Sequence, residues 1–232
     1  MVDQRSGLDR ALLGRTYQDY ILASGFKVPL PPGQWAMLAN TSIAARAHPE
    51  NKGIAYFLGD IENKRLVGAV WFYAMRSTPP PGVGFEEFKG CAMPDNLYSS
   101  HGPVAAFGHQ SCWTMHAFFT PPMQQWADKA AKMDETVRAA AGDMAAKGVS
   151  YPQDFVIVQF FQSETWGLLN VSYLFSPDKD GVSSDVAPTL QDSDWFGTHV
   201  QKSALQVAYV EKLHKWGEAF LPKIMAAFEA GQ

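Results

Sequence analysis

The residues best able to do chemistry are gathered in one stretch, residues 91–116, which reads CAMPDNLYSSHGPVAAFGHQSCWTMH. It holds both cysteines of the chain and three of its six histidines. Thiolate and imidazole groups are ligands that zinc accepts, and two cysteines can also form a disulfide. The wide separation of Cys91 and Cys112 argues against a redox centre of the adjacent-thiol type.

A metal site in this stretch would draw on His101, His109, Cys112 and His116. In a strand, Cys112 and His116 would share a face because alternate side chains point the same way, and His109 would approach from the preceding loop. The closely spaced cysteine pairs and the His-Glu-x-x-His helix that make a zinc prediction specific are absent. Zinc at these residues is therefore the alternative interpretation.

Cys91 and Cys112 have two further interpretations, which depend on the compartment. In an exported protein we expect a structural disulfide, and closing a loop of this length would contribute about 3 kcal/mol. In a cytosolic protein the better interpretation is two inert, buried thiols. The sequence leaves both open.

A second metal candidate is the stretch SPDKDGVSSD at residues 176–185. Asp178 and Asp180 match ligand positions of a calcium loop, and Asp185 adds a third carboxylate. The position that requires a bidentate glutamate is Ala187, and an Asp-Gly turn accounts for the same residues. Because the sequence also has no Gly-x-Ser-x-Gly motif, we predict no catalytic residues.

Aromatic side chains are the remaining binding candidates, since they make up 13% of the chain. We single out Trp166, Tyr173, Trp195 and Phe196. Trp195 and Phe196 lie in the polar stretch SSDVAPTLQDSDWFGTH, where exposed aromatic residues often anchor partners. The alternative is that this pair folds back to cover an edge of the sheet.

The first half of the chain predicts mostly strands. Both strands of a hairpin around the polar turn 62–65 carry apolar residues at odd and even positions, which predicts that both of their faces are covered. A second hairpin turns at residues 163–165. The expected strands are residues 26–30, 35–45, 54–61, 66–75, 155–161 and 166–175.

Two long helices are expected in the second half. Apolar residues at helical spacing predict one from residue 123, capped by Thr120, to Gly148, and another over residues 203–230 with a kink at Pro222. We interpret residues 1–24 as a partly helical leader and residues 77–122 as a loop-rich insertion. The expected fold is a single α+β domain over residues 1–232, a mainly antiparallel sheet packed by two long helices in an α/β/α-like sandwich.

Composition limits the partners. The formal net charge is −4 and the 19 basic residues are scattered, which argues against a nucleic-acid surface. No stretch approaches the roughly 20 apolar residues of a transmembrane helix. As given, the chain slightly favours the cytoplasm, and export to the periplasm is the alternative if a signal peptide has been removed.

The order of elements resembles a known family. Residues Gly25-Phe26-Lys27-Val28-Pro29, followed by Pro32-Gly33-Gln34-Trp35, are similar to the opening motif of PsbP-like domains, which include lipoprotein relatives of the LpqN and DcrB type. The resemblance implies an α/β/α sandwich and an accessory or assembly role outside the cytoplasm, and it transfers no catalytic residues. The insertion at 77–122 departs from the family pattern.

The leading functional hypothesis is a non-catalytic binding or assembly-accessory module that contacts a protein partner or a small apolar ligand, without a cofactor. The alternative is a metal-binding protein or enzyme centred on the histidines and Cys112. The sequence predicts no particular oligomeric state.

Overall fold

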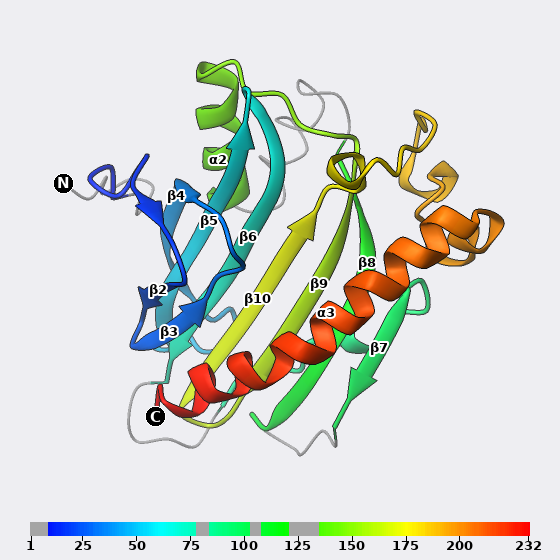
Figure 1. Cartoon of the computed structure of the whole chain (residues 1–232). Helices are drawn as coiled ribbons and strands as arrows, with labels where there is room; N and C mark the ends of the chain where they lie inside the picture. The colour runs from blue at the N-terminus through cyan, green and yellow to red at the C-terminus, as the bar shows by residue number, and fades with distance from the viewer. Residues whose placement is uncertain (1–8, 78–83, 103–107, 121–134) are drawn as a thin grey trace.

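The computed structural model describes residues 9–77, 84–102, 108–120 and 135–232. Its centre is an eight-stranded antiparallel sheet in the order β1-β4-β5-β6-β10-β9-β8-β7 (Figure 1). These strands are β1 (Thr16–Tyr17), β4 (Trp35–Ala44), β5 (Lys52–Glu62), β6 (Arg65–Arg76), β7 (Tyr98–His101), β8 (Gln110–Phe119), β9 (Asp154–Ser163) and β10 (Gly167–Phe175). The predicted α+β class is confirmed.

The hairpin of β5 and β6 forms where the sequence predicts it. Asn63 and Lys64 both have positive φ angles, 49° and 60°, which is the backbone of the tight turn that matches the twist of paired strands. Apolar side chains of β6 alternate between the two faces of the sheet: Val70 and Phe72 pack in one core cluster and Ala69 packs in the other. The hairpin is therefore covered on both sides, as expected.

One face of the sheet is covered by the long helix α3 (Ala204–Glu229), and we name it the α3 face (Figure 1). The Ser203 side chain accepts a hydrogen bond from the backbone N–H of Gln206 and so caps this helix. Tyr209, Leu213 and Phe220 are buried against the sheet, as are Ile224 and Ala227. Leu205, expected on the same stripe, is 68% exposed, and α3 continues through Pro222.

The opposite face, which we name the α2 face, is partly covered by α2 (Glu135–Ala146). Val137, Ala140 and Met144 of this helix are buried against the sheet, and all three belong to the predicted stripe. Residues 121–134, the first part of that predicted helix, lie outside the described residues. The two helices thus cover opposite faces of one sheet.

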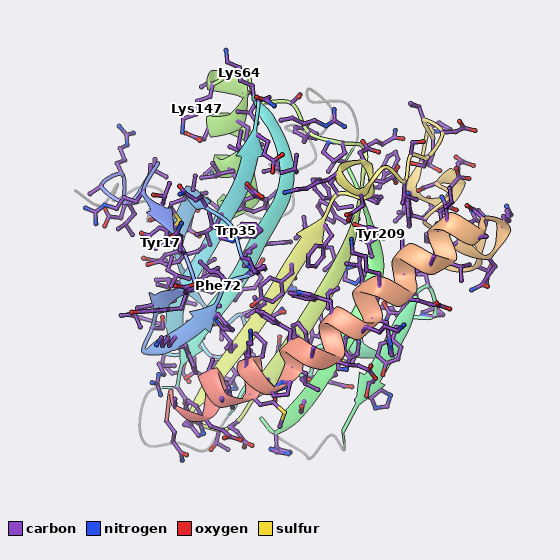
Figure 2. All side chains as sticks on the ribbon, in the orientation of Figure 1. Tyr17, Trp35, Lys64, Phe72, Lys147 and Tyr209 are labelled. Atoms are coloured by element: carbon purple, nitrogen blue, oxygen red, sulfur yellow. A yellow bond between two sulfur atoms is a disulfide. The ribbon has the colours of Figure 1, made fainter. Side chains whose placement is uncertain are left out.

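A small second sheet closes one end of the α3 face. It pairs β2 (Tyr20–Ala23) with β3 (Phe26–Pro29), and Ile21, Phe26 and Val28 are buried in the same core cluster as the aromatic residues of α3. Figure 2 shows Trp35 and Phe72 beside this hairpin, over the large sheet. Trp35 donates its indole N–H to the carbonyl of Pro31 at 2.9 Å.

Two sequence interpretations need correction. The segment at 77–122, interpreted as a loop-rich insertion, supplies β7 and β8 to the large sheet, and its residues 78–83 and 103–107 lie outside the described part. Within the leader, residues 9–24 form a turn and the strands β1 and β2, not a helix. Positive φ angles at Asp19 and Ser24 reverse the chain there, which a helix does not allow. Among the described helices, none is long and apolar enough to span a membrane.

Candidate functional site

The two cysteines are joined in a disulfide. Cys91 lies in the short helix η1 (Lys89–Ala92) and Cys112 lies on β8, with 6.1 Å between their Cα atoms. Both are buried and pack against Phe161, with Phe88 and Leu168 at the edge of the same cluster. The disulfide thus fixes η1 to the α2 face of the sheet and confirms that interpretation of the pair.

The predicted zinc ligands are not brought together. The sulfur of Cys112 is in the disulfide, His101 is exposed on β7, and His109 is exposed and pairs with Glu164. His116 is half-buried two positions beyond Thr114 on the same face of β8 as Cys112. Across residues 9–77, 84–102, 108–120 and 135–232, no group of three or more metal-ligating side chains is arranged to hold an ion.

The calcium candidates are also separated. Asp178 pairs with Arg65 at 2.7 Å and Asp180 pairs with Lys212 at 2.8 Å, so each carboxylate already has a cationic partner. Asp185 is exposed farther along the loop. Gly181, with a φ of 75°, ends the short helix η2 (Pro177–Asp180), so the residues form the Asp-Gly turn that was the alternative explanation.

Two of the four aromatic binding candidates lie in the core. Trp195 is 0% exposed and Tyr173 is 1% exposed, so neither can contact a partner at the surface. Trp166 is half-buried and stacks on Phe228, with 4.6 Å between ring centroids, and Phe196 is half-buried. Trp195 therefore folds inward, as the alternative interpretation stated.

A cavity of about 390 Å³ opens on the α2 face beside the disulfide. Its floor is formed by strands β6, β9 and β10, and its walls by residues 43–48 and 84–88. The lining is mainly aromatic and aliphatic, and Arg46, Glu86 and Glu87 supply exposed charged groups. Its large apolar residues are Ile43, Tyr73, Met75, Phe85, Phe88, Phe161 and Leu168.

Hydrogen bonds hold the wall at residues 84–88 in place. Asn51 donates its side-chain amide to the carbonyl of Gly84 at 3.0 Å. The Gln110 side chain bonds the backbone of Phe88 twice, accepting from its N–H at 2.9 Å and donating to its carbonyl at 3.0 Å. The Phe88 ring stacks on Phe161 with centroids 4.9 Å apart. The cavity is therefore formed before any ligand enters, which lowers the entropy cost of binding.

A row of polar side chains crosses the sheet next to the cavity. Trp71, Ser172, Gln159 and Thr114 are cross-strand neighbours on the α2 face, one row beyond Tyr73 and its neighbours on the cavity floor. Among the described residues, the indole N–H of Trp71 and the hydroxyl of Thr114 are buried without a hydrogen-bond partner. Such groups favour a ligand or water that can bond to them.

The half-buried His116 predicts a pH effect on stability. Burial lowers its pKa to about 4, and Asp95 opposes this shift. Because the unfolded chain takes up a proton near pH 6.5 and the folded chain does not, stability should fall by about 2 kcal/mol as the pH drops from 6.5 to 4.

Urea unfolding at a series of pH values checks this expectation. His116→Gln should make the decline shallower, whereas His101→Gln, at an exposed position on β7, should leave it unchanged. An equally steep decline in His116→Gln would contradict the assignment.

Comparison with known proteins leaves the site to be interpreted from its own geometry, because no family model, curated protein or solved structure matches the chain. The resemblance to PsbP-like domains accordingly stays a prediction. Sequence reasoning missed the cavity, although the pattern Phe85-Glu-Glu-Phe88 could have suggested an apolar wall with a charged rim.

Proposed function

We propose that this chain is a non-catalytic binding protein that takes up a small, mainly apolar ligand in the cavity on its α2 face. The observation that carries the proposal is the cavity itself. Its volume of about 390 Å³ lies in the range of small-molecule sites, and its aromatic and aliphatic lining is typical of them. The unpaired hydroxyl of Thr114 and indole of Trp71 in the adjacent row favour a ligand with one polar end.

The charged lining residues support a binding role over a catalytic one. Arg46, Glu86 and Glu87 are exposed, so water competes for them and they offer weak orientation of a substrate. The buried floor offers Phe161, Leu168 and Met75, which pack but do not transfer protons. Affinity would come from the burial of apolar surface.

The disulfide beside the cavity supports an exported protein. Disulfides persist in oxidising compartments and are rare in the cytosol. The bond between Cys91 and Cys112 shares Phe88, Phe161 and Leu168 with the cavity wall, so it preorganises the site. We therefore propose an accessory role in an oxidising compartment.

Filling the cavity tests the proposal. Leu168→Trp should weaken binding of the apolar fluorescent probe 1-anilinonaphthalene-8-sulfonate about tenfold, because the larger ring occupies the space that the probe needs. Ala45→Phe fills the cavity from residues 43–48 and should act in the same direction. The measurement is the rise in probe fluorescence on titration into each folded variant.

Leu205→Trp is the matched control, since Leu205 is 68% exposed on α3 and lies on the other face of the sheet. It adds the same ring without touching the cavity and should bind the probe as the parent protein does. Unchanged binding in both Leu168→Trp and Ala45→Phe would refute the assignment of the cavity as the binding site.

A further inference from the structure

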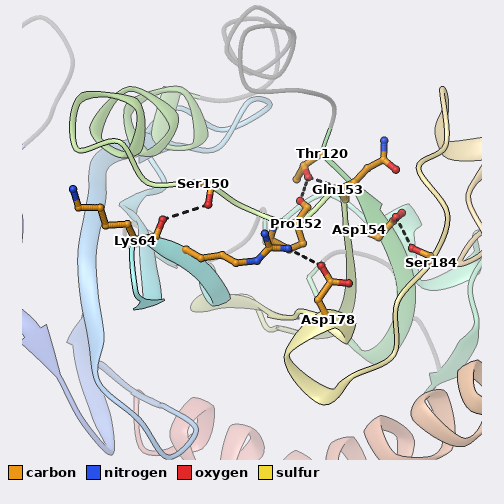
Figure 3. Close-up of polar contacts among 9 residues, drawn as sticks. Lys64, Thr120, Ser150, Pro152, Gln153, Asp154, Asp178 and Ser184 are labelled. Carbon is orange, nitrogen blue, oxygen red and sulfur yellow. Dashed lines mark hydrogen bonds and ion pairs between the residues drawn. The ribbon is translucent and has the colours of Figure 1, made fainter.

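A second cavity, of about 200 Å³, lies at the other end of β9. Phe161, near the end of that strand, lines the first cavity, whereas Asp154, at its start, lines the second. Figure 3 shows the surroundings of Asp154, where the loop before β9 meets η2 and the loop that carries Ser184. The main lining residues are Arg65, Tyr151, Asp154, Asp178, Ser184 and Trp195.

The walls of this second cavity are fixed by hydrogen bonds. Thr120 donates its hydroxyl to the carbonyl of Gln153 at 2.8 Å, and the backbone N–H of Ser150 donates to the carbonyl of Lys64 at 2.9 Å. The Gln153 side chain bonds Ala187 in both directions, at 2.7 and 2.8 Å. Loops from both sides of the cavity are therefore held to the sheet, and the cavity keeps its shape without a ligand.

Asp154 is a buried carboxylate whose charge is not compensated by a cation in the described part of the chain. It is 5% exposed, and it accepts hydrogen bonds from Ser193 at 2.7 Å and from Ser184 at 3.2 Å. Burial raises the pKa of Asp154, and the nearby charges of Asp178 and Asp194 raise it further against the two serine bonds. A buried carboxylate without a counter-charge is costly, so a cation in the cavity would relieve that cost.

The charges around the cavity favour one positive charge. Arg65 and Asp178 line the cavity and neutralise each other across 2.7 Å. Asp154 is left as the one unbalanced charge among the described lining residues. A monovalent organic cation would complete the balance, and a divalent one would exceed it.

Trp195 adds a second requirement. Its side chain is fully buried and lines the cavity, and its indole N–H has no hydrogen-bond partner among the described residues. An indole ring also attracts a cation to its face. A ligand that satisfies both Asp154 and Trp195 must carry a positive charge and a hydrogen-bond acceptor.

We propose that this cavity binds a small protonated amino alcohol, with its ammonium group bonded to Asp154 and its oxygen accepting from the indole N–H of Trp195. The volume of about 200 Å³ limits the ligand to a few heavy atoms. This site is separate from the proposed apolar cavity, and its success or failure does not depend on that proposal.

Ethanolamine is the probe for the test, titrated into the full-length protein at pH 8 and followed by the NMR signal of the Trp195 indole N–H, assigned by its loss in Trp195→Phe. We expect a saturable shift with ethanolamine. Ethylamine, which lacks the oxygen, should bind about tenfold more weakly, and ethanol, which lacks the charge, should produce no shift. An equal shift with sodium chloride at the same concentration would overturn the proposal, because it would indicate a simple ion site.

Asp154→Asn removes the charge and retains a side chain that can bond Ser184 and Ser193, so the protein should fold. It should weaken ethanolamine binding at least about tenfold. Asp185→Asn is the matched control, because Asp185 is exposed in the same loop and does not line the cavity. The proposal fails if ethanolamine produces no saturable shift in the parent protein, or if Asp154→Asn binds it as tightly as Asp185→Asn does.

Discussion

Replacing Tyr173 with alanine is expected to lower the free energy of unfolding by about 3–5 kcal/mol, the usual cost of removing a large buried aromatic ring. Tyr173 is 1% exposed, and its ring makes edge contacts with Trp216 and Phe220, at centroid distances of 5.3 and 5.2 Å. Its hydroxyl donates to the carbonyl of Pro29 at 2.7 Å and so joins β10 to the small sheet. Guanidinium chloride unfolding measures the loss.

Tyr173→Phe separates the ring from the hydroxyl. It keeps the aromatic packing and leaves the carbonyl of Pro29 without this donor, so we expect a loss of about 1–2 kcal/mol. Both variants that fold should bind the apolar probe as the parent protein does, because Tyr173 packs on the α3 face, away from the cavity. A stable Tyr173→Ala protein with weakened probe binding would reverse this assignment and make Tyr173 a ligand contact.

Removing the disulfide is expected to have the second largest effect. Cys91 and Cys112 are separated by 21 positions, and releasing a loop of this length should cost about 3 kcal/mol through the added entropy of the unfolded chain. The double variant Cys91→Ala with Cys112→Ala should show this loss in denaturant unfolding. The parent protein should show the same loss on reduction, and the double variant should not respond to the reductant.

Intact mass under denaturing, non-reducing conditions provides an independent check. The parent protein should resist alkylation and weigh two hydrogens less than its reduced form. Two alkylated thiols in protein purified without reductant would contradict the disulfide and restore the interpretation of inert thiols. Probe binding should also weaken in the double variant, because Phe88 and Leu168 pack on the disulfide and line the cavity.

Local sequence patterns predicted the parts of the fold that depend on neighbours along the chain. Asn63 indicated the hairpin turn of β5 and β6, and the spacing of Tyr209, Leu213 and Phe220 indicated the buried stripe of α3. In both cases the backbone geometry follows from residues only a few positions apart. These predictions agree with the structure within a few residues at each end.

Features that depend on distant residues were missed. Strand β8 was hidden in the predicted insertion because its sequence QSCWTMHAFF mixes polar and apolar residues on both faces, so it lacks the alternation that indicates a strand. Trp195 was expected near the surface because its loop is polar, yet it packs against Tyr209 of α3 at a centroid distance of 5.5 Å. The first cavity joins residues 43–48 to residues 84–88 and to Leu168, and no local pattern reports such a meeting.

Strand β9 sets the distance between the two proposed ligands. Seven residues separate Asp154 from Phe161, and an extended strand rises about 3.3 Å per residue, so their Cα atoms lie about 23 Å apart. One small molecule cannot span that distance. Each cavity can therefore fill without steric exclusion of the other, and any cooperativity between them would have to travel through a strand paired on both edges, with β8 and β10. The protein would be a two-compartment carrier whose loads are kept apart by one strand.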